Sequence, residues 1–499
     1  MLPTSLWKDS TSQELYPRLA GNLHVDVAVI GGGIAGVTAA LFLQRAGEKV
    51  ALLEAFRLGA GETGKTTAHL TELLDTPYRD IESKFGRERA CLVAESARAA
   101  IQRIQSLASE LGGARFERVP AYVYAETAAQ RRELEREIQS LQRVGARAIW
   151  VDQPPLPFSV QGAVRVDAQA QFHPLEYVRA VARELARVGG HIYEQTRVLG
   201  MSDGEPCRLK PEHGVVTARY VLVLANVPVN NRVALHTKLA AYRSYAIAMP
   251  LPSSESFPPG LFYDMQDPYH YVRKQSTDRG TFLIVGGADH KTGQEQHTDD
   301  CYRRLSQFSR QKLGMNGAEY RWSGQIIEPA DGLPFIGNDP GSKHVYVATG
   351  FSGTGMTFGT LSAMLLRDAV VGVENPWARL YAASRFRPLA QAKSYVSENV
   401  DYPACLLRDR LSRGEANSMH DVMPGEGRLV RDHGRMLAVY RDHDGRIHSR
   451  SAVCTHMGCL VGWNDAERTW DCPCHGSRFT TDGDVISGPA EKPLSEVDA

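Results

Sequence analysis

Val25-Asp-Val-Ala-Val-Ile30-Gly31-Gly-Gly33-Ile-Ala-Gly36 has the pattern of a buried strand followed by a glycine-rich turn that opens a helix. The helical pattern continues from Val37 to Ala46, and Lys49–Leu53 has the pattern of a second strand, followed by Glu54. In such a unit the glycines let the backbone approach a pyrophosphate at the helix N-terminus, and the acid binds a ribose hydroxyl. We therefore predict a dinucleotide site that includes Gly31, Gly33, Gly36 and Glu54. A glycine-rich turn without a ligand is the alternative.

Two cysteine–histidine motifs lie near the other end of the chain, at Cys454-Thr-His456 and Cys472-Pro-Cys-His475. Each motif supplies one thiolate and one imidazole, which together are the ligand set of a Rieske [2Fe-2S] centre. Zinc is the competing interpretation, but zinc sites of this composition usually group the two cysteines together and the two histidines together. The spacing therefore favours a [2Fe-2S] cluster on Cys454, His456, Cys472 and His475.

Residues from about Glu426 to Leu494 resemble the Rieske proteins of respiratory cytochrome bc complexes. The resemblance implies a disulfide between Cys459 and Cys474 that ties the two cluster loops together, and a cover over the cluster from Gly488–Ala490. One departure concerns the hydroxyl groups that bond to the cluster sulfurs in that family. Ser477 is present, but Phe479 stands where the family has a tyrosine.

The glycine-rich unit is accompanied by two further segments, Gly59-Ala-Gly-Glu-Thr-Gly64-Lys-Thr-Thr-Ala68 and Ala348-Thr-Gly350-Phe-Ser-Gly353-Thr-Gly355-Met-Thr357. With them, residues from about Val25 to Pro388 resemble FAD enzymes of the D-amino-acid oxidase and glycine oxidase superfamily. The resemblance implies an isoalloxazine flanked by Thr66, Thr67 and Ala68, an adenine contact from the backbone of Val198, and a pyrimidine end that faces Gly353, Thr354, Gly355 and Met356. Together the two resemblances point to bacterial FAD-dependent oxidoreductases with a C-terminal Rieske domain.

The same resemblance predicts how the flavin is held. Some relatives attach FAD covalently to a histidine in the segment after Gly64, but here that position is Ala68, and His69 is one residue further on. A shift of one residue redirects the side chain, so we expect non-covalent FAD. Acid precipitation should release all the yellow colour, and colour that stays in the pellet would contradict the prediction.

These resemblances predict a Rossmann-like α/β FAD-binding domain, an α+β substrate domain with an antiparallel sheet, and an all-β Rieske domain. We expect the oxidoreductase part at 1–390. Within it, the FAD-binding domain would take about 22–90, 161–235 and 323–390, and the substrate domain about 91–160 and 236–322. A linker at 391–415 would precede the Rieske domain at 416–499.

The composition is that of an ordinary globular protein, with 43% hydrophobic and 23% charged residues. The 57 basic and 57 acidic residues give a formal net charge of zero, so nothing favours binding to nucleic acid or to an anionic membrane. The chain shows neither the roughly 18 consecutive apolar residues of a transmembrane helix nor an N-terminal secretory signal. We expect no nucleic-acid partner, no membrane span and a cytoplasmic location.

Candidate catalytic residues come from the predicted roof over the flavin. Oxidation of an amine needs a C–H bond held over the flavin and a lone pair on nitrogen, but no obligatory acid or base. Arg243 and Arg273 are candidates because a guanidinium binds a carboxylate bidentately. His173, Tyr245 and Trp322 are further candidates, and a purely structural role is the alternative for each of the five.

Three functions fit these features. The chain has no second G-x-G-x-x-G pattern that would suggest a nicotinamide domain, so electrons should enter from a substrate that is oxidised at the flavin. The first function is therefore oxidation of a small amine or amino acid at FAD, with electrons leaving through the cluster to an external protein, quinone or oxygen. The second is an electron-transfer protein that serves a partner enzyme. The third is a Rieske oxygenase, which needs a 2-His-1-carboxylate iron site. Its nearest grouping is His290, His297 and Asp299, without a supporting pattern.

Overall fold

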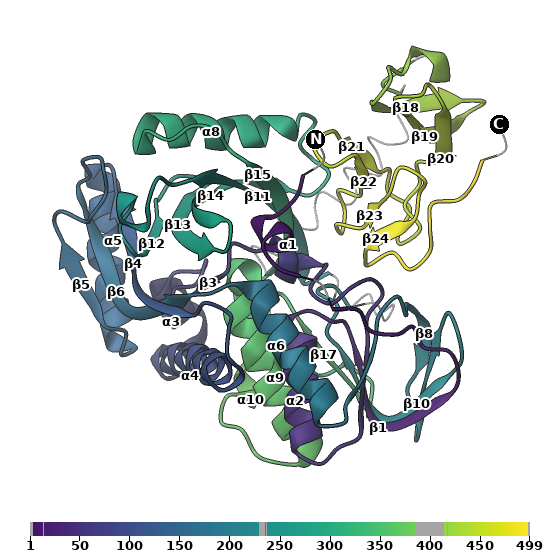
Figure 1. Ribbon diagram of the computed structural model, residues 1–499, viewed down its shortest axis with the longest axis horizontal. Helices are drawn as coiled ribbons and strands as arrows, with labels where there is room; N and C mark the ends of the chain where they lie inside the picture. Colours follow the sequence, from purple (N-terminus) through teal and green to yellow (C-terminus); the bar gives the residue numbers. More distant parts are fainter. Residues whose placement is uncertain are drawn as a thin grey trace.

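The computed structural model describes residues 3–12, 14–228, 235, 237–385, 414–416 and 418–497 (Figure 1). Two large sheets form the first part of the chain, and a smaller β-domain, yellow in Figure 1, lies beside them. Residues 391–413 of the predicted linker lie outside the described part. Among the described helices, none is long and apolar enough to cross a membrane.

The first sheet is the predicted Rossmann-like sheet. Its strands are β1 Leu23–Ile30, β2 Val50–Leu53, β7 His191–Tyr193, β8 Val198–Ser202, β9 Cys207–Pro211, β10 Val216–Val223, β16 Phe335–Asn338 and β17 Val345–Thr349. The order is β16-β17-β10-β1-β2-β7, with β9 paired to β10 and β8 to β9. β17, β10, β1, β2 and β7 run parallel, while β16 and β9 are antiparallel to their neighbours.

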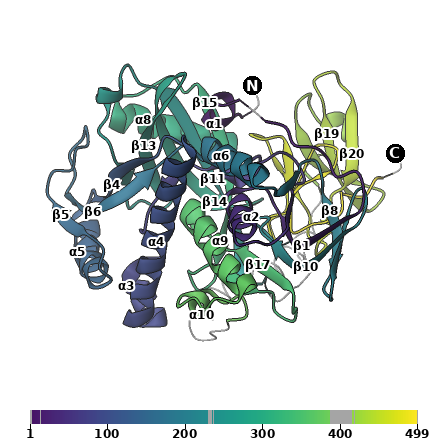
Figure 2. The same ribbon diagram turned by 60° about the horizontal axis from the view of Figure 1, so that its bottom comes forward.

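Strand β1 is buried on both faces, which explains its nearly continuous hydrophobic sequence. Val27 and Val29 face one core, and Ala28 and Ile30 face the other. Helices pack together beside this sheet, as Figure 2 shows. They are α2 Ile34–Arg45, α4 Arg87–Leu111, α6 Pro174–Arg187 and α9 Gly355–Val371. Helix α2 begins earlier than predicted, because Gly33 already has the extended conformation of an N-cap.

The second sheet is mostly antiparallel, as expected for a substrate domain. Its strands are β3 His69–Leu70, β4 Glu117–Ala125, β5 Ala148–Val151, β6 Gly162–Gln171, β11 Leu239–Pro250, β12 Leu261–Tyr263, β13 His270–Thr277, β14 Gly280–Lys291 and β15 Tyr320–Pro329. The order is β15-β11-β14-β13-β12-β4-β6-β3, with β5 on β6. Strand β6, which the sequence analysis placed in the FAD-binding part, joins this sheet because it pairs along its length with β4.

Among the described residues, five further helices accompany these sheets. They are α1 Leu6–Asp9, α3 Tyr78–Phe85, α5 Ala128–Arg143, α8 Asp299–Leu313 and α10 Ala378–Tyr381. Helix α10 contacts β16 of the first sheet. Helix α5 begins at Ala128, because Thr127 and Gln130 form a capping box there. Helix α8 packs on β11 and β14.

The C-terminal domain is all-β, as predicted. It contains a three-stranded and a four-stranded antiparallel sheet. The strands are β18 Gly427–Asp432, β19 Arg435–Arg441, β20 Ile447–Ser451, β21 Gly462–Asn464, β22 Thr469–Asp471, β23 Arg478–Phe479 and β24 Val485–Ser487. Its main core combines Trp470 and Phe479 with the buried Cys454 and Cys472.

Candidate active site and metal centre

The turn between β1 and α2 leaves no room for side chains. A Cβ on Gly36 would lie 1.8 Å from the carbonyl oxygen of Gly31, so the helix can approach the strand only with glycine there. Gly31 has a positive φ of 109°, and a Cβ on it would lie 2.5 Å from the Leu224 carbonyl oxygen. The N-terminus of α2 therefore opens onto the adjoining cavity through Gly33 and Ile34, which is the arrangement that binds a pyrophosphate.

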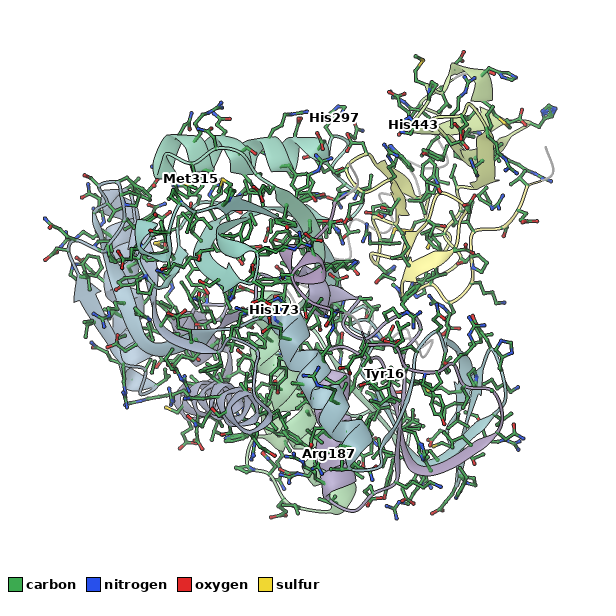
Figure 3. All side chains as sticks on the ribbon, viewed as in Figure 1. Tyr16, His173, Arg187, His297, Met315 and His443 are labelled. Carbon is green, nitrogen blue, oxygen red and sulfur yellow. A yellow bond between two sulfur atoms is a disulfide. The ribbon has the colours of Figure 1, made fainter. Side chains whose placement is uncertain are left out.

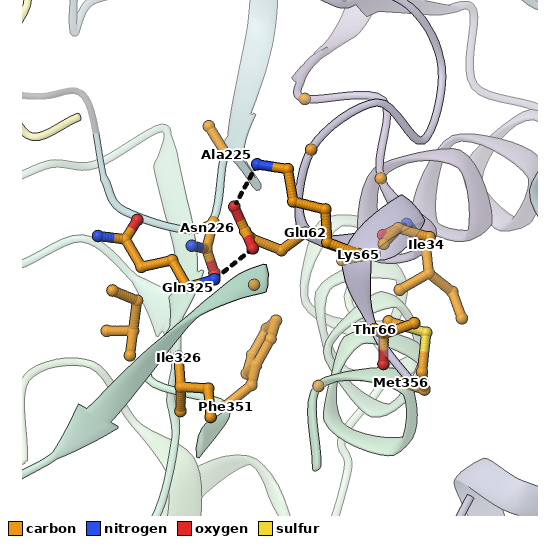
Figure 4. Close-up of a pocket in the computed structure, with 18 of the residues that line it drawn as sticks. Ile34, Glu62, Lys65, Thr66, Ala225, Asn226, Gln325, Ile326, Phe351 and Met356 are labelled. Atoms are coloured by element: carbon orange, nitrogen blue, oxygen red, sulfur yellow. Dashed lines mark hydrogen bonds and ion pairs between the residues drawn. The ribbon is translucent and has the colours of Figure 1, made fainter. Parts of the chain in front are cut away.

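This cavity has a volume of about 620 Å³ and lies between the glycine-rich turn and the second sheet (Figure 4). Most of the predicted FAD-binding residues line it: Gly31, Gly33, Glu54, Thr66, Thr67, Val198, Gly353, Thr354, Gly355 and Met356. Gly36 lies beneath the turn instead. Ala68 is fully buried with a φ of 58°, and its carbonyl oxygen accepts a hydrogen bond from Arg273. The donor set and the glycine cradle fit FAD.

Glu54 has the position expected of a ribose-binding acid. Its carboxylate accepts hydrogen bonds from the backbone N–H groups of Gly32, at 2.6 Å, and Phe56, at 2.7 Å. Burial raises the pKa of Glu54, and these two hydrogen bonds oppose the rise. The bonds hold the carboxylate at the wall of the cavity, where a sugar hydroxyl can donate to it.

The part of the cavity under the second sheet is lined by aromatic and polar side chains. His69 Nδ1 lies 2.7 Å from the Tyr263 hydroxyl oxygen. Asp75 accepts a 2.5 Å hydrogen bond from the backbone N–H of Gly353, and the Tyr269 hydroxyl lies 3.5 Å from the same carboxylate. Burial raises the pKa of Asp75 and lowers that of His69, so the imidazole is neutral at neutral pH.

None of the five candidate catalytic residues lines this cavity. His173 caps α6: its Nδ1 accepts from the Glu176 N–H, and its Nε2 lies 3.0 Å from the Ser10 hydroxyl (Figure 3). Burial lowers the pKa of His173 to about 3, so it serves as a neutral cap. The Trp322 indole N–H donates to the Lys65 carbonyl oxygen. The Tyr245 hydroxyl lies 3.0 Å from His290 Nε2.

The two arginines are also engaged elsewhere. Arg243 is fully buried at the boundary with the C-terminal domain, where it pairs with Glu467 and donates to Ser323. Arg273 is fully buried, donates to the Ala68 carbonyl at 2.8 Å and also bonds to Gln275. A substrate carboxylate would have to displace these partners. Arg243 points away from the cavity because side chains alternate between the two faces of β11. Ser244 and Ala246, which lie on the opposite face of the strand, line the cavity instead.

The sequence analysis missed His69, Asp75 and Tyr263 as cavity residues. They come from two distant segments, β3 with the residues that follow it and β12, and no shared motif marks them. Tyr269 and Tyr271 also line the cavity. The sequence signal for these two residues is the aromatic segment Tyr269-His-Tyr271 at the start of β13. The same segment leads to Arg273, so it did not distinguish the tyrosines from the arginine as cavity residues.

The cluster motifs come together as two similar loops. The Cys454 N–H donates to the Cys459 carbonyl and the Cys472 N–H to the Ser477 carbonyl, both at 2.8 Å. The two cysteines are buried, and the His456 and His475 rings lie 4.9 Å apart. Cys459 and Cys474 form the disulfide that the resemblance implied. Two thiols and two imidazoles in one place fit a [2Fe-2S] cluster with mixed ligands.

Ser477 and Phe479 lie where the sequence analysis expected donors to the cluster. Ser477 is buried and hydrogen-bonds to the Cys454 thiol, whereas Phe479 packs in the same core without a hydroxyl. We expect Phe479→Tyr to raise the reduction potential, because a new donor to a sulfur stabilises the reduced cluster. A gain of about 1.4 kcal/mol corresponds to about 60 mV. A redox titration followed by electron paramagnetic resonance measures it, and an unchanged or lower potential would contradict the prediction.

The oxygenase alternative finds no support in the described residues. The His290 ring is bonded to Tyr245, while Asp299 pairs with Arg303 and Arg321. His297 lies exposed near the start of α8 (Figure 3).

The C-terminal domain contacts the first part of the chain directly beside the cavity. Gln325 donates from its side chain to the Gly476 carbonyl oxygen, at 2.7 Å, and accepts from the Ser487 hydroxyl, at 3.0 Å. Its backbone N–H bonds to Glu62, which also pairs with Lys65 (Figure 4). Gln325 and Ser487 both line the cavity. One side chain therefore joins the cavity to the residue that follows His475.

A buried ion cluster spans this contact. The Glu467 carboxylate pairs with Arg243 of β11 and with Arg478 of β23, and Arg478 also pairs with Asp471 at 3.0 Å. Burial opposes ionisation of Glu467, but the two guanidinium groups outweigh this effect and lower its pKa to about 2. The network joins the cluster domain to the second sheet, and loss of one member would leave a buried charge without a partner.

Comparisons with known proteins agree with this architecture. Residues 26–369 match the family model for FAD dependent oxidoreductases, and residues 414–498 match the Rieske [2Fe-2S] domain. YhfW of Bacillus subtilis (strain 168), named as a Rieske 2Fe-2S iron-sulfur protein, is 33% identical over 500 residues, which cover 99% of this chain and 98% of that protein.

Two further relatives resemble the first part of the chain. Gamma-glutamylputrescine oxidoreductase of Escherichia coli (strain K12) is 24% identical over 378 residues, covering 72% of this chain and 86% of that protein. The crystal structure of glycine oxidase from Geobacillus kaustophilus has a TM-score of 0.63 at 19% identity, covers 73% of this chain and 100% of that chain, and shows the shared fold. The chain therefore belongs to the FAD-dependent oxidoreductases of the amino-acid oxidase type and carries a C-terminal Rieske domain, with FAD and a [2Fe-2S] cluster as its cofactors.

Proposed function

We propose that this protein oxidises a small amine or amino-acid-like substrate at FAD and passes the electrons one at a time through its [2Fe-2S] cluster to an external acceptor. One observation carries the proposal: the two domains line a single cavity. Ile486, Ser487 and Gly488 of the Rieske domain lie in the same wall as Thr66 and Met356 of the oxidoreductase part. The relative named for gamma-glutamylputrescine supports an amine as the substrate.

FAD supplies two-electron oxidation of a C–H bond, and the cluster supplies one-electron transfer. The surrounding residues position and shield the reaction. Tyr263 and Tyr271 have pKa values that burial raises well above neutrality, so they remain uncharged donors or acceptors towards a substrate. Gln325 and its two partners, Gly476 and Ser487, provide a hydrogen-bonded connection from the cavity to a cluster loop.

Rapid mixing of the holoenzyme with substrate under nitrogen tests the proposal. We expect flavin absorbance to bleach first, followed by reduction of the cluster. An artificial acceptor should then support steady turnover that depends on the substrate. A cluster that stays oxidised beside fully reduced flavin would reject the relay. Flavin reduction only by a second protein, and by no small molecule of these classes, would favour the electron-transfer alternative.

A further inference from the structure

The substrate end of the cavity is an aromatic chamber, which we define as His69, Asp75, Tyr263, Tyr269 and Tyr271. All five line the cavity under the second sheet. The ring of His69 lies 5.3 Å from that of Tyr263 and 5.5 Å from that of Tyr271, and the rings of Tyr271 and Tyr269 are 5.6 Å apart. The faces of such rings are electronegative and attract organic cations.

Two carboxyl groups lie in or beside the chamber, and burial raises the pKa of both, that of Asp289 to about 7. An ammonium ion bound beside them would favour their charged forms. Asp75 reaches the chamber from the segment after β3, and Asp289 of β14 lies behind Ser244, which hydrogen-bonds to it. Asp289 Oδ1 is buried without a hydrogen-bond partner. In addition, His69 is only 8% exposed, and its Nε2 also lacks a partner. Buried polar atoms are normally satisfied, so these two atoms indicate that the chamber is completed by a bound group.

Positive charge lies elsewhere in the cavity. Its described lining contains Lys8, Lys65 and Arg197. Lys65 pairs with Glu62, and Lys8 interacts with both of them. Arg197 lies over the ring of Phe56 and donates to Val485 of the Rieske domain. Arg273 is the nearest cation to the chamber, but it lies outside the cavity lining and is held by Ala68 and Gln275. A carboxylate placed in the chamber would therefore face the Asp75 carboxyl group without a cation free to pair with it, and in a buried site this is costly.

We propose that the chamber selects a diamine without a carboxylate, holding its unreactive nitrogen as an ammonium ion between Asp75 and the tyrosine rings. This inference rests on the proposed function and names its substrate class. The other nitrogen reacts in its neutral form. Hydride leaves the adjacent carbon for FAD, the nitrogen lone pair forms the C=N bond, and the nitrogen then releases a proton to solvent. Two electrons thereby move from the substrate to FAD.

A pair of matched compounds tests the selection. 1,4-Diaminobutane and ornithine differ only by a carboxylate. Under nitrogen, we expect 1,4-diaminobutane to bleach the flavin at least about tenfold faster than ornithine at equal concentration. Equal or faster bleaching by ornithine would overturn the inference and leave the proposed function standing.

Binding can be measured separately from oxidation. Tetramethylammonium has no lone pair and cannot be oxidised, so a change in the flavin spectrum during its titration reports occupancy of the chamber. We expect Asp75→Asn, which keeps an acceptor for the Gly353 N–H, to weaken this binding about tenfold or more. Asp278→Asn is the matched control, because Asp278 is exposed and pairs with Arg115 outside the cavity.

Variants of Tyr269 distinguish ring attraction from hydrogen bonding. Tyr269→Leu should weaken binding of tetramethylammonium, and Tyr269→Phe should restore much of the loss because it keeps the ring. FAD content is measured for each variant, so that loss of the cofactor is recognised. Unchanged tetramethylammonium binding in both Asp75→Asn and Tyr269→Leu would overturn the inference. Binding that depends on Asp75, with no flavin bleaching by the diamine, would support the chamber's cation preference and count against the proposed function.

Discussion

Glu467→Gln should separate oxidation of substrate from reduction of the cluster. The change leaves Arg243 and Arg478 buried without the carboxylate that they share, and removal of one partner from a buried ion pair costs about 3–5 kcal/mol. We expect the contact between the domains to loosen while the FAD cradle stays intact. Flavin bleaching should keep its rate, and the later cluster reduction should slow by about tenfold or more.

Rapid mixing that follows flavin and cluster separately measures this effect. Glu496→Gln is the matched control, because Glu496 is an exposed acid of the same domain that pairs only loosely with Arg450, at 3.6 Å. If Glu467→Gln and the control reduce the cluster equally fast, the ion cluster does not position the domain.

The same network predicts how acid affects the contact between the domains. The pKa of Glu467 falls from 4.5 to about 2 when its partners surround it, so it contributes stability above pH 4.5. That contribution is lost as the pH falls from about 4.5 through 2. The interface should therefore keep its Glu467 contribution throughout the neutral range.

Replacing His456 or His475 with Ala should abolish the Rieske cluster and leave FAD bound. Each histidine supplies one of the two imidazoles in the predicted ligand set, and the FAD cradle is built from other segments. We expect the reduced protein to lose the low-average-g signal in electron paramagnetic resonance, and its iron content to fall, at an unchanged flavin content.

His433→Ala is the control for these variants, since His433 is 88% exposed in the turn between β18 and β19. A signal that survives both ligand changes would contradict the assignment. Stoichiometric zinc without iron in fresh wild-type protein would do the same.

Local sequence was sufficient for the parts of the site that single segments build. The strand, turn and helix at Val25–Gly36 form as predicted, because their hydrophobic pattern and glycine requirements are local. The cluster loops are equally local, and the Cys459–Cys474 disulfide follows from their similarity to a known family. The fold class and both cofactors are confirmed by the family matches.

The substrate end could not be predicted in the same way. His69 and Asp75 lie on one segment and Tyr263 on another, the two share no motif, and pairing within the second sheet brings β3 and β12 to the same cavity. Arg243 illustrates the same limit from the other direction. A buried arginine on a roof strand suits a substrate carboxylate, but alternation along β11 turns it towards Glu467, which lies over 200 residues away in the chain.

By itself, the sequence determined what binds: a strand–turn–helix unit for the FAD pyrophosphate, and two thiolates with two imidazoles for the cluster. Those features depend on spacing within a few residues. The tertiary structure alone decided what faces the flavin and how the two domains meet, because strand pairing and domain contact join residues that are distant in sequence. Gln325 lines the cavity and donates to the Gly476 carbonyl of the Rieske domain, and only folding brings these two residues, which are distant in sequence, into contact.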